Sequence, residues 1–156
     1  MHAFEHQSTE QTLTEALEEY YRENPGLSKL RDMSAPAQEF FRCHDAAHVV
    51  FGCGTSLPHE AVVKLATVFG TTGGLRALSG SRLHESFSIY RKLKLGEVLA
   101  TILLSIVVVP RTIVRCMRQR RKWPWSKFSQ YTHVPLRTVR ADLGIRVPGN
   151  EGAPER

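Results

Sequence analysis

The chain has 156 residues, a formal net charge of +6 and 42 % apolar residues. This length favours one domain around one hydrophobic core, and the composition is that of a folded protein rather than a disordered chain. The three cysteines, Cys43, Cys53 and Cys116, form no CxxC pair. They do not support a disulfide framework and favour a reducing compartment. The first residues, MHAFEHQSTE, contain acid and no long apolar run, which argues against a secretory signal or a transit peptide.

Helical spacing of apolar residues predicts an all-α fold, because no segment alternates convincingly with a period of two. The first helix is expected over LTEALEEYYRE, which is rich in acid. Ser8 and Gln11 before it fit a capping box, and the turn Asn24-Pro25-Gly26 should end it.

The second and third predicted helices surround the most chemically dense part of the chain. The second should begin near Ser34, run through AQEFFRCHDAAHVVF and end at Gly52 or Gly54. The third, PHEAVVKLATVF, should follow Ser56 as its cap and end near Gly70. The Gly-rich turn between these helices can fold the third back against the second.

A long helical region is expected from about Leu83, interrupted at Gly96 and bent at Pro110. A short helix should follow, with Pro135 at its start and Gly144 just after its end. We therefore expect an acidic N-terminal helix at 1–26, a single-domain helical bundle at 27–146 and a disordered tail at 147–156. This bundle should hold a central HDxxH helix and a long apolar helix.

Four ligand-type side chains lie close together along the second and third helices. His44 and His48 are four residues apart, so they share one face of a helix. Asp45 lies within reach of that face, and Glu60 can face it from the third helix. Two histidines at this spacing form a clamp for a divalent metal ion.

An ordinary hydrogen-bonded core is the competing interpretation of these residues. Phe41 and Phe51 continue the histidine stripe, so it should face inward. A buried imidazole or carboxylate needs a partner, because unpaired burial costs several kcal/mol. A metal ion would satisfy the whole group at once, but spacing alone leaves both interpretations open.

HDAAH followed after eleven residues by Glu60 resembles the HDxxH-x11-E signature of the Coq4 family of ubiquinone-biosynthesis proteins. The closing PLRTVRADLGI is similar to that family's C-terminal segment, and the resemblance is clearest from Arg31 to Val68. Compared with that family, the chain is shorter at its N-terminus. The resemblance implies an all-helical fold in which His44, Asp45, His48 and Glu60 hold a divalent metal ion, with Zn²⁺ expected.

The same resemblance implies a function in ubiquinone biosynthesis and a polyprenylated quinone precursor as the bound molecule. Family members are linked to replacement of the ring C1 carboxylate by hydroxyl, and also to a scaffolding role. We therefore expect metal-dependent C1 decarboxylation, with the metal as Lewis acid. The alternative is a non-catalytic scaffold that holds lipid intermediates for other ubiquinone-biosynthesis proteins. The oligomeric state stays open, a homodimer included.

The segment VLATILLSIVVV, Val98 to Val109, is the longest apolar run. Its twelve residues would cover about 18 Å as a helix, against roughly 30 Å of hydrocarbon in a bilayer. It is therefore expected either as a buried core helix or as the wall of a groove for an isoprenoid tail. The residues expected to face lipid are Val98, Ala100, Ile102, Leu103 and Ile106.

A basic, Trp-containing stretch, PRTIVRCMRQRRKWPW, follows directly. Arg115, Arg118, Trp123 and Trp125 suit an anionic membrane surface, where tryptophan and basic residues both settle. A solvated basic face is the simpler alternative. No nucleic-acid motif accompanies the charge, so nucleic acid is not an expected partner. The expected location is cytoplasmic, peripheral at the inner membrane, or on the matrix side of the inner mitochondrial membrane in a eukaryote.

A phosphohydrolase of the HD type is a further alternative for the histidine motif. That superfamily needs an additional upstream histidine and a downstream aspartate. The candidates, His2, His6 and Asp142, lie far from the motif in the chain, which disfavours this interpretation.

Overall fold

The structure, a computed structural model, describes residues 2–27, 34–81 and 95–148. These residues form helices and no strand, and two isolated β-bridges join Thr12 to Pro135 and Thr71 to Trp123. The all-α fold class is thereby confirmed for this part of the chain. Its elements in chain order are η1 (Ala3–Glu5), α1 (Leu13–Glu23), α2 (Ala35–Val50), α3 (Leu57–Gly70), α4 (Gly74–Ser81), α6 (Leu95–Met117), η3 (Phe128–Tyr131) and α7 (Leu136–Leu143).

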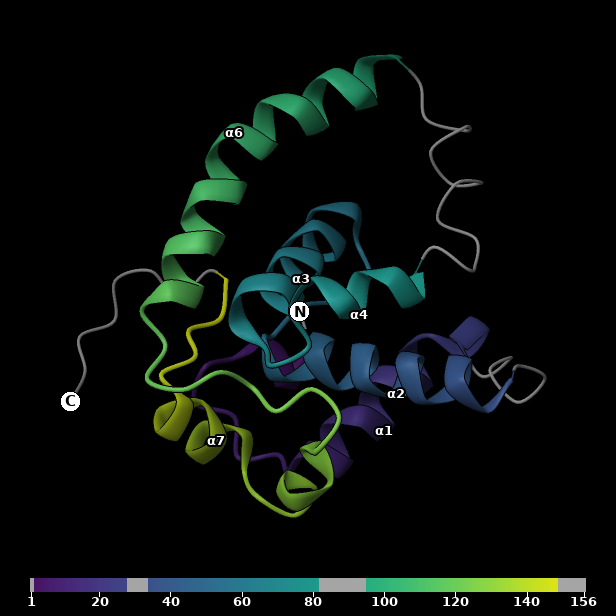
Figure 1. Cartoon of the computed structure of the whole chain (residues 1–156), viewed down its shortest axis with the longest axis vertical. Coiled ribbons are helices and arrows are strands. Elements are labelled where there is room, and N and C mark those ends of the chain that lie inside the picture. The colour runs from purple at the N-terminus through teal and green to yellow at the C-terminus, as the bar shows by residue number, and fades with distance from the viewer. Residues whose placement is uncertain (1, 28–33, 82–94, 149–156) are drawn as a thin grey trace.

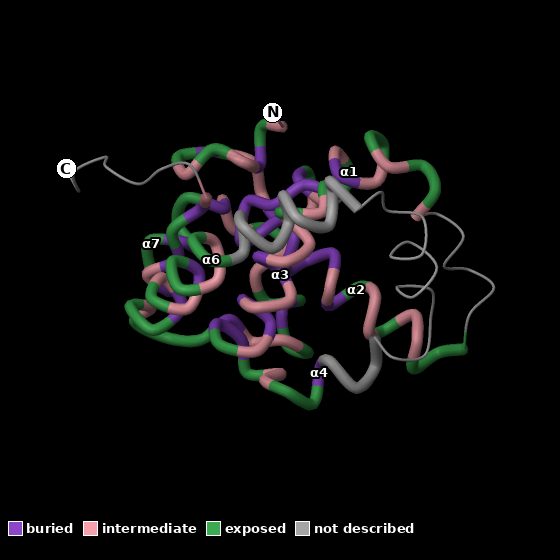
Figure 2. Tube along the Cα trace, turned by 90° about the horizontal axis from the view of Figure 1, so that it is seen from above, coloured by how far each residue is buried: buried purple, intermediate pink, exposed green. Residues whose placement is uncertain are grey.

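Helix α2 packs against η1, α1, α3, α4 and α7, while α6 packs mainly along α3 (Figure 1). The buried positions gather where α1, α2 and α3 meet (Figure 2). Phe4 from η1 and Ile145 after α7 belong to the same core as Val49 of α2. Residues from both ends of the described chain therefore support the helix that carries the histidine motif.

Helix α1 covers the predicted segment LTEALEEYYRE, but its cap differs from the prediction. Thr12, rather than Ser8, is the capping residue, and its hydroxyl accepts a hydrogen bond from the backbone N–H of Glu15. The Glu15 carboxylate in turn accepts from the Thr12 backbone N–H at 2.8 Å. This reciprocal pair is a complete capping box.

The end of α2 is shaped by Gly52, whose φ of +65° is the left-handed conformation that glycine adopts most readily. The Gly52 N–H bonds to the carbonyl of Val49, and the Cys53 N–H bonds to the carbonyl of His48. This pair of bonds is the Schellman motif that ends many helices. A Cβ on Gly52 would lie 2.6 Å from Val147, so the position leaves no room for a side chain. The turn therefore folds the chain back over His48.

Helix boundaries predicted from local signals are confirmed at several other points. Ser34 and Ser56 precede α2 and α3 as expected. Pro135 precedes α7, and Gly144 follows it with a φ of +71°. The end of α7 is thus closed by a left-handed glycine.

Helix α6 runs from Leu95 to Met117, with Pro110 inside it (Figure 1). The interruption expected at Gly96 falls in its first turn, and the predicted start near Leu83 lies outside the described residues. No helix in the described ranges is both long and apolar enough to span a membrane. Val147, which the sequence assigned to the tail, is 1 % exposed and packs at the edge of the core.

Candidate metal centre

Two helices bring three ligand-type side chains to one point. Helix α2 carries His44 and His48 one turn apart, and α3 carries Glu60 in its first turn. The ligand atoms of these three residues lie within 4.8 Å of one another. The predicted return of the third helix against the second is therefore what creates the cluster.

Two distances within the cluster are close to the edges of a metal polyhedron. The Nε2 atoms of His44 and His48 are 3.2 Å apart, and Oε1 of Glu60 lies 3.1 Å from Nε2 of His48. Oε2 of Glu60 lies 3.8 Å from Nε2 of His44, which is somewhat longer. Ligands at about 2.0–2.1 Å from a tetrahedral Zn²⁺ are separated by about 3.3 Å. The three residues could therefore hold a metal ion, with a fourth position left for water or substrate.

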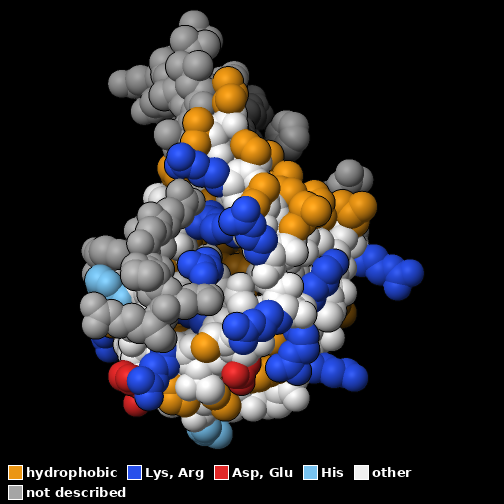
Figure 3. All heavy atoms as spheres, turned by 90° about the vertical axis from the view of Figure 1, so that its left-hand side faces the viewer, with side chains coloured by type: hydrophobic (Ala, Val, Ile, Leu, Met, Phe, Trp, Pro, Cys, Tyr) orange, Lys and Arg blue, Asp and Glu red, His pale blue; other side chains and the backbone are white. Residues whose placement is uncertain are grey.

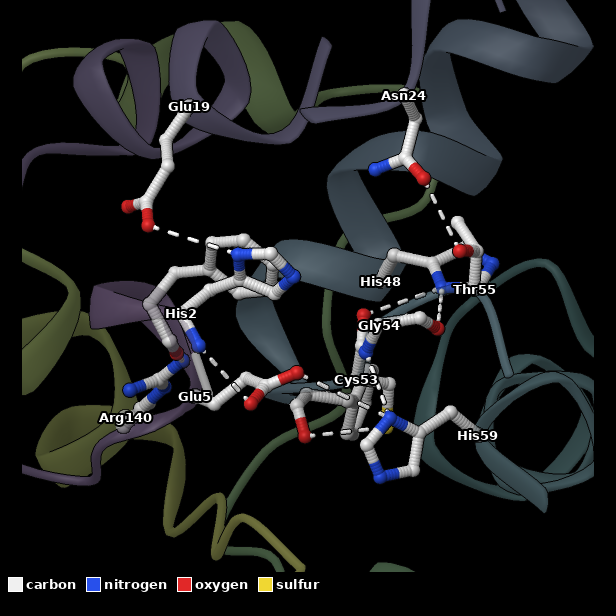
Figure 4. A network of polar contacts seen from close by, with 12 residues as sticks. His2, Glu5, Glu19, Asn24, His48, Cys53, Gly54, Thr55, His59 and Arg140 are labelled. Atoms are coloured by element: carbon white, nitrogen blue, oxygen red, sulfur yellow. Dashed lines mark hydrogen bonds and ion pairs between the residues drawn. The ribbon is translucent and has the colours of Figure 1, made fainter. Parts of the chain in front are cut away.

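The turn after α2 fixes the orientation of His48. Its Nδ1 lies 3.2 Å from the carbonyl of Cys53 and 3.1 Å from that of Gly54, and the side chain is 0 % exposed (Figure 4). Carbonyl oxygens only accept hydrogen bonds, so Nδ1 must carry the proton. The other ring nitrogen, Nε2, is then directed at His44 and Glu60. A metal-binding histidine needs this arrangement.

Glu60 is held ionised by its neighbours. Burial raises the pKa of this carboxyl, but the hydrogen bonds and charges of His44 and His48 outweigh burial and leave the pKa well below its ordinary value. Its side chain is 31 % exposed, against 17 % for His44. The cluster is therefore closed on the side of His48 and accessible from the side of His44 and Glu60.

Asp45 lies outside the three-residue cluster, although the sequence placed it in the same ligand set. Its carboxylate accepts a hydrogen bond from the hydroxyl of Tyr21 at 3.0 Å, and the residue is 2 % exposed. Burial raises the pKa of Asp45, while His44 and Tyr21 act in the opposite direction. Tyr21 comes from α1, so the partner of this carboxylate is supplied by an element that the motif does not include.

Aromatic rings surround the histidines. Phe40 stacks on His44 with ring centroids 5.9 Å apart, and Trp125 contacts Phe40 at the same centroid distance. Tyr20 lies against His48, with centroids 5.4 Å apart. Phe40 and Tyr20 are not among the site residues predicted from the sequence. Phe40 was recognisable as the residue one turn before His44, whereas only the packing of α1 on α2 reveals Tyr20.

The membrane-facing residues predicted from the sequence have different surroundings. Trp123 is wrongly placed at a membrane surface, because it is 0 % exposed and its ring lies 5.2 Å from that of Tyr131 in the core. Its backbone N–H bonds to the Gly70 carbonyl, which holds it there. Trp125 is half-buried against Phe40. Trp123 therefore joins the loop after α6 to the end of α3.

Arg115 turns partly inward, donating to the buried Thr112 at 3.2 Å, whereas Arg118 is exposed. Ile106, which the sequence also placed on the lipid-facing side, is 66 % exposed. The other side chains predicted to face lipid lie outside the described part: Val98, Ala100, Ile102 and Leu103.

The C-terminal half of α6 has a mixed basic and apolar surface. Figure 3 shows Lys and Arg side chains spread over this face beside hydrophobic ones, with few acidic groups. Exposed apolar residues of α6 include Ile106, Val107, Val114 and Met117. Such a surface suits contact with an anionic, partly apolar partner.

Comparison with known proteins adds no relative. No family model matches the chain, and neither a curated protein nor a solved structure matches it. The site is therefore interpreted from its own geometry.

Proposed function

We propose that this protein binds a divalent metal ion, with Zn²⁺ as the first candidate, through His44, His48 and Glu60. The observation that carries the proposal is the convergence of these three side chains, from two helices, at the spacing of a tetrahedral site. Two imidazoles and one carboxylate are a donor set that suits catalytic zinc, because it leaves a coordination position open. The partly exposed His44 and Glu60 give that position an approach from outside.

We propose further that the molecule approaching this position is a polyprenylated quinone precursor, in line with the resemblance of the motif to the Coq4 family. A bound metal would act as a Lewis acid toward phenolate and carboxylate oxygens of such a ring. Phe40 and Trp125 would offer aromatic surface to the ring beside His44. The reaction class proposed is loss of the ring C1 carboxylate as carbon dioxide, with a proton taking its place on the ring.

We also propose that the protein associates peripherally with an anionic membrane and takes its lipid substrate from that membrane. The exposed Arg118 and the exposed apolar side chains of α6 support it. Each basic residue near an anionic surface contributes about 1 kcal/mol, so several together would hold the protein there.

Metal analysis of the purified protein, with and without added Zn²⁺, tests the first proposal. His48→Ala should lose most of the bound metal while keeping its helical spectrum. His133→Ala is the matched control, because His133 is exposed and lies outside the cluster. Equal metal content in His44→Ala, His48→Ala and the wild type would refute the metal site.

Turnover of a polyprenyl hydroxybenzoate by the metal-loaded and the metal-free protein tests the reaction. Metal-dependent loss of carbon dioxide would support an enzyme. Stoichiometric binding of the same compound without turnover would instead support the scaffold, in which the protein holds the intermediate for other ubiquinone-biosynthesis proteins.

A further inference from the structure

A single peptide group links the candidate metal ligand His48 to a second histidine. The carbonyl of Cys53 accepts from Nδ1 of His48 at 3.2 Å. The N–H of the same peptide, that of Gly54, donates to Nδ1 of His59 at 2.8 Å. Figure 4 shows His59 and His48 on opposite sides of the Cys53–Gly54 segment. The peptide thus lies between two imidazole rings and is hydrogen-bonded to both.

These bonds assign the protons. Because the Gly54 N–H is a donor, Nδ1 of His59 must be the unprotonated nitrogen of its ring. Because the Cys53 carbonyl is an acceptor, Nδ1 of His48 must be protonated. Consecutive hydrogen bonds through one peptide polarise one another, so the acceptor at His59 strengthens the bond at His48.

The first turn of α3 carries both Glu60 and His59, which act on the two ring nitrogens of His48. Glu60 reaches Nε2 of His48 at 3.1 Å, while the preceding His59 reaches the loop that holds the other nitrogen of the same ring. Cys53 and Gly54 are buried, but the His59 side chain is 33 % exposed. A replacement at His59 therefore removes a contact of the loop while disturbing little of the core.

We infer that His59 is a positioning residue for the metal site. It holds the Cys53–Gly54 peptide, whose carbonyl orients the His48 ring so that Nε2 points at His44 and Glu60, where the metal would bind. The inference rests on the proposed metal site for its consequence in binding, but the state of the His48 ring exists without a metal. Groups that orient a ligand in this way contribute about 10–100-fold to metal affinity, and we expect about tenfold here because His59 acts through a peptide.

Two variants separate orientation from simple loop packing. His59→Ala removes the acceptor, whereas His59→Asn keeps an acceptor oxygen near the place of Nδ1. His133→Ala serves as the control for loss of an exposed histidine. Circular dichroism establishes that each variant keeps its helical content.

The first measurement is ¹⁵N NMR of the imidazoles in the metal-free protein. His48 should show a protonated Nδ1 in the wild type, in His59→Asn and in His133→Ala. In His59→Ala the Nδ1 resonance of His48 should shift toward that of a weaker hydrogen bond, because the peptide that accepts from it is no longer held. An unchanged His48 Nδ1 resonance in His59→Ala would overturn the inference, whatever the metal affinity of the wild type.

The second measurement is titration with Co²⁺, whose visible absorption reports ligand geometry. His59→Ala should bind about tenfold more weakly and with an altered spectrum, and His59→Asn should recover most of the affinity. Equal affinity and equal spectra in His59→Ala and the wild type would also overturn the inference. If the wild type binds no Co²⁺, the proposed metal function is refuted separately. The ¹⁵N NMR measurement on the metal-free protein then still decides whether His59 positions His48.

Discussion

Arg140 of α7 joins three distant parts of the chain, and its replacement by methionine is expected to be strongly destabilising. The residue is 0 % exposed. Its guanidinium donates to the carbonyls of Val49 and Val50 at the end of α2, each at 2.9 Å. It also donates to the carbonyls of Phe4 and His6 near the N-terminus, each at 2.6 Å. One side chain therefore ties the N-terminal segment and α7 to the helix that carries the candidate ligands.

The magnitude follows from the carbonyls of Phe4 and Val50, which would lose the guanidinium as donor in Arg140→Met. The other two carbonyls keep a second donor, since Val49 also accepts from the Gly52 N–H and His6 from the Thr9 N–H. Leaving a buried acceptor unpaired costs about 1–3 kcal/mol, so two carbonyls at an intermediate figure give about 4 kcal/mol. Removing the buried charge recovers part of this, because burial is unfavourable for the guanidinium and lowers its pKa to about 10. A net loss of about 3 kcal/mol remains, which is a large share of the 5–15 kcal/mol that stabilise a typical domain.

Urea unfolding, followed by circular dichroism, measures this loss. Arg137→Met is the matched control on the same helix, because Arg137 is exposed and pairs with the exposed Glu10 at 2.9 Å. Such a surface pair contributes at most about 1 kcal/mol. The buried guanidinium does not hold these segments together if Arg140→Met lowers the free energy of unfolding by less than about 1 kcal/mol, no more than Arg137→Met does.

Four further tests concern other parts of the structure. Gly52→Ala should lower the urea midpoint by at least the equivalent of about 1 kcal/mol, because its φ is +65° and the new Cβ would meet Val147; an unchanged midpoint would contradict the strained turn. Burial raises the pKa of Cys53 to about 12, so this thiol should react with a thiol reagent at about pH 8 only after unfolding; rapid labelling of the native protein would be the opposite result. Because the pKa of Glu60 is lowered, its charge stabilises the metal-free fold above the ordinary value of 4.5, and this contribution is lost as pH falls through the lower folded pKa. Metal-free Glu60→Gln should therefore be less stable than the wild type at neutral pH and approach it in acid, whereas a pH-independent difference would disprove the assignment. Arg118→Glu should weaken sedimentation with anionic vesicles at low salt. If the wild type binds neutral vesicles at high salt as well as it binds anionic vesicles at low salt, the basic face does not cause membrane binding.

Local features of the sequence determined where most helices begin and end. Helices α2 and α3 begin after Ser34 and Ser56, each with a proline in its first turn, although neither serine side chain makes a capping hydrogen bond. Gly144 ends α7 because the left-handed conformation depends only on the residue itself and its neighbours. The pairing of His44 with His48 is of the same kind, since a spacing of four is fixed by the helix itself. The capping box predicted at Ser8 is wrong, because Thr12 and Glu15 form an equally local capping box and α1 uses that one.

Contacts between distant segments were decided only by the tertiary structure. Asp45 is the clearest case: its sequence position suggested a metal ligand, but Tyr21 of α1 donates a hydrogen bond to its carboxylate. Trp123 looked like a membrane anchor beside basic residues, and packing on Tyr131 places it in the core instead. A side chain in a polar or basic stretch is buried when another element covers it, and no local pattern specifies that element.

The candidate site depends on both the local sequence and the tertiary structure. The helix spacing places two imidazoles on one face, but spacing does not specify which ring nitrogen carries the proton. That is decided by the turn at Gly52, which brings the carbonyls of Cys53 and Gly54 to Nδ1 of His48. A buried imidazole takes the tautomer that satisfies its hydrogen-bond partners, and those partners are set by the folded chain.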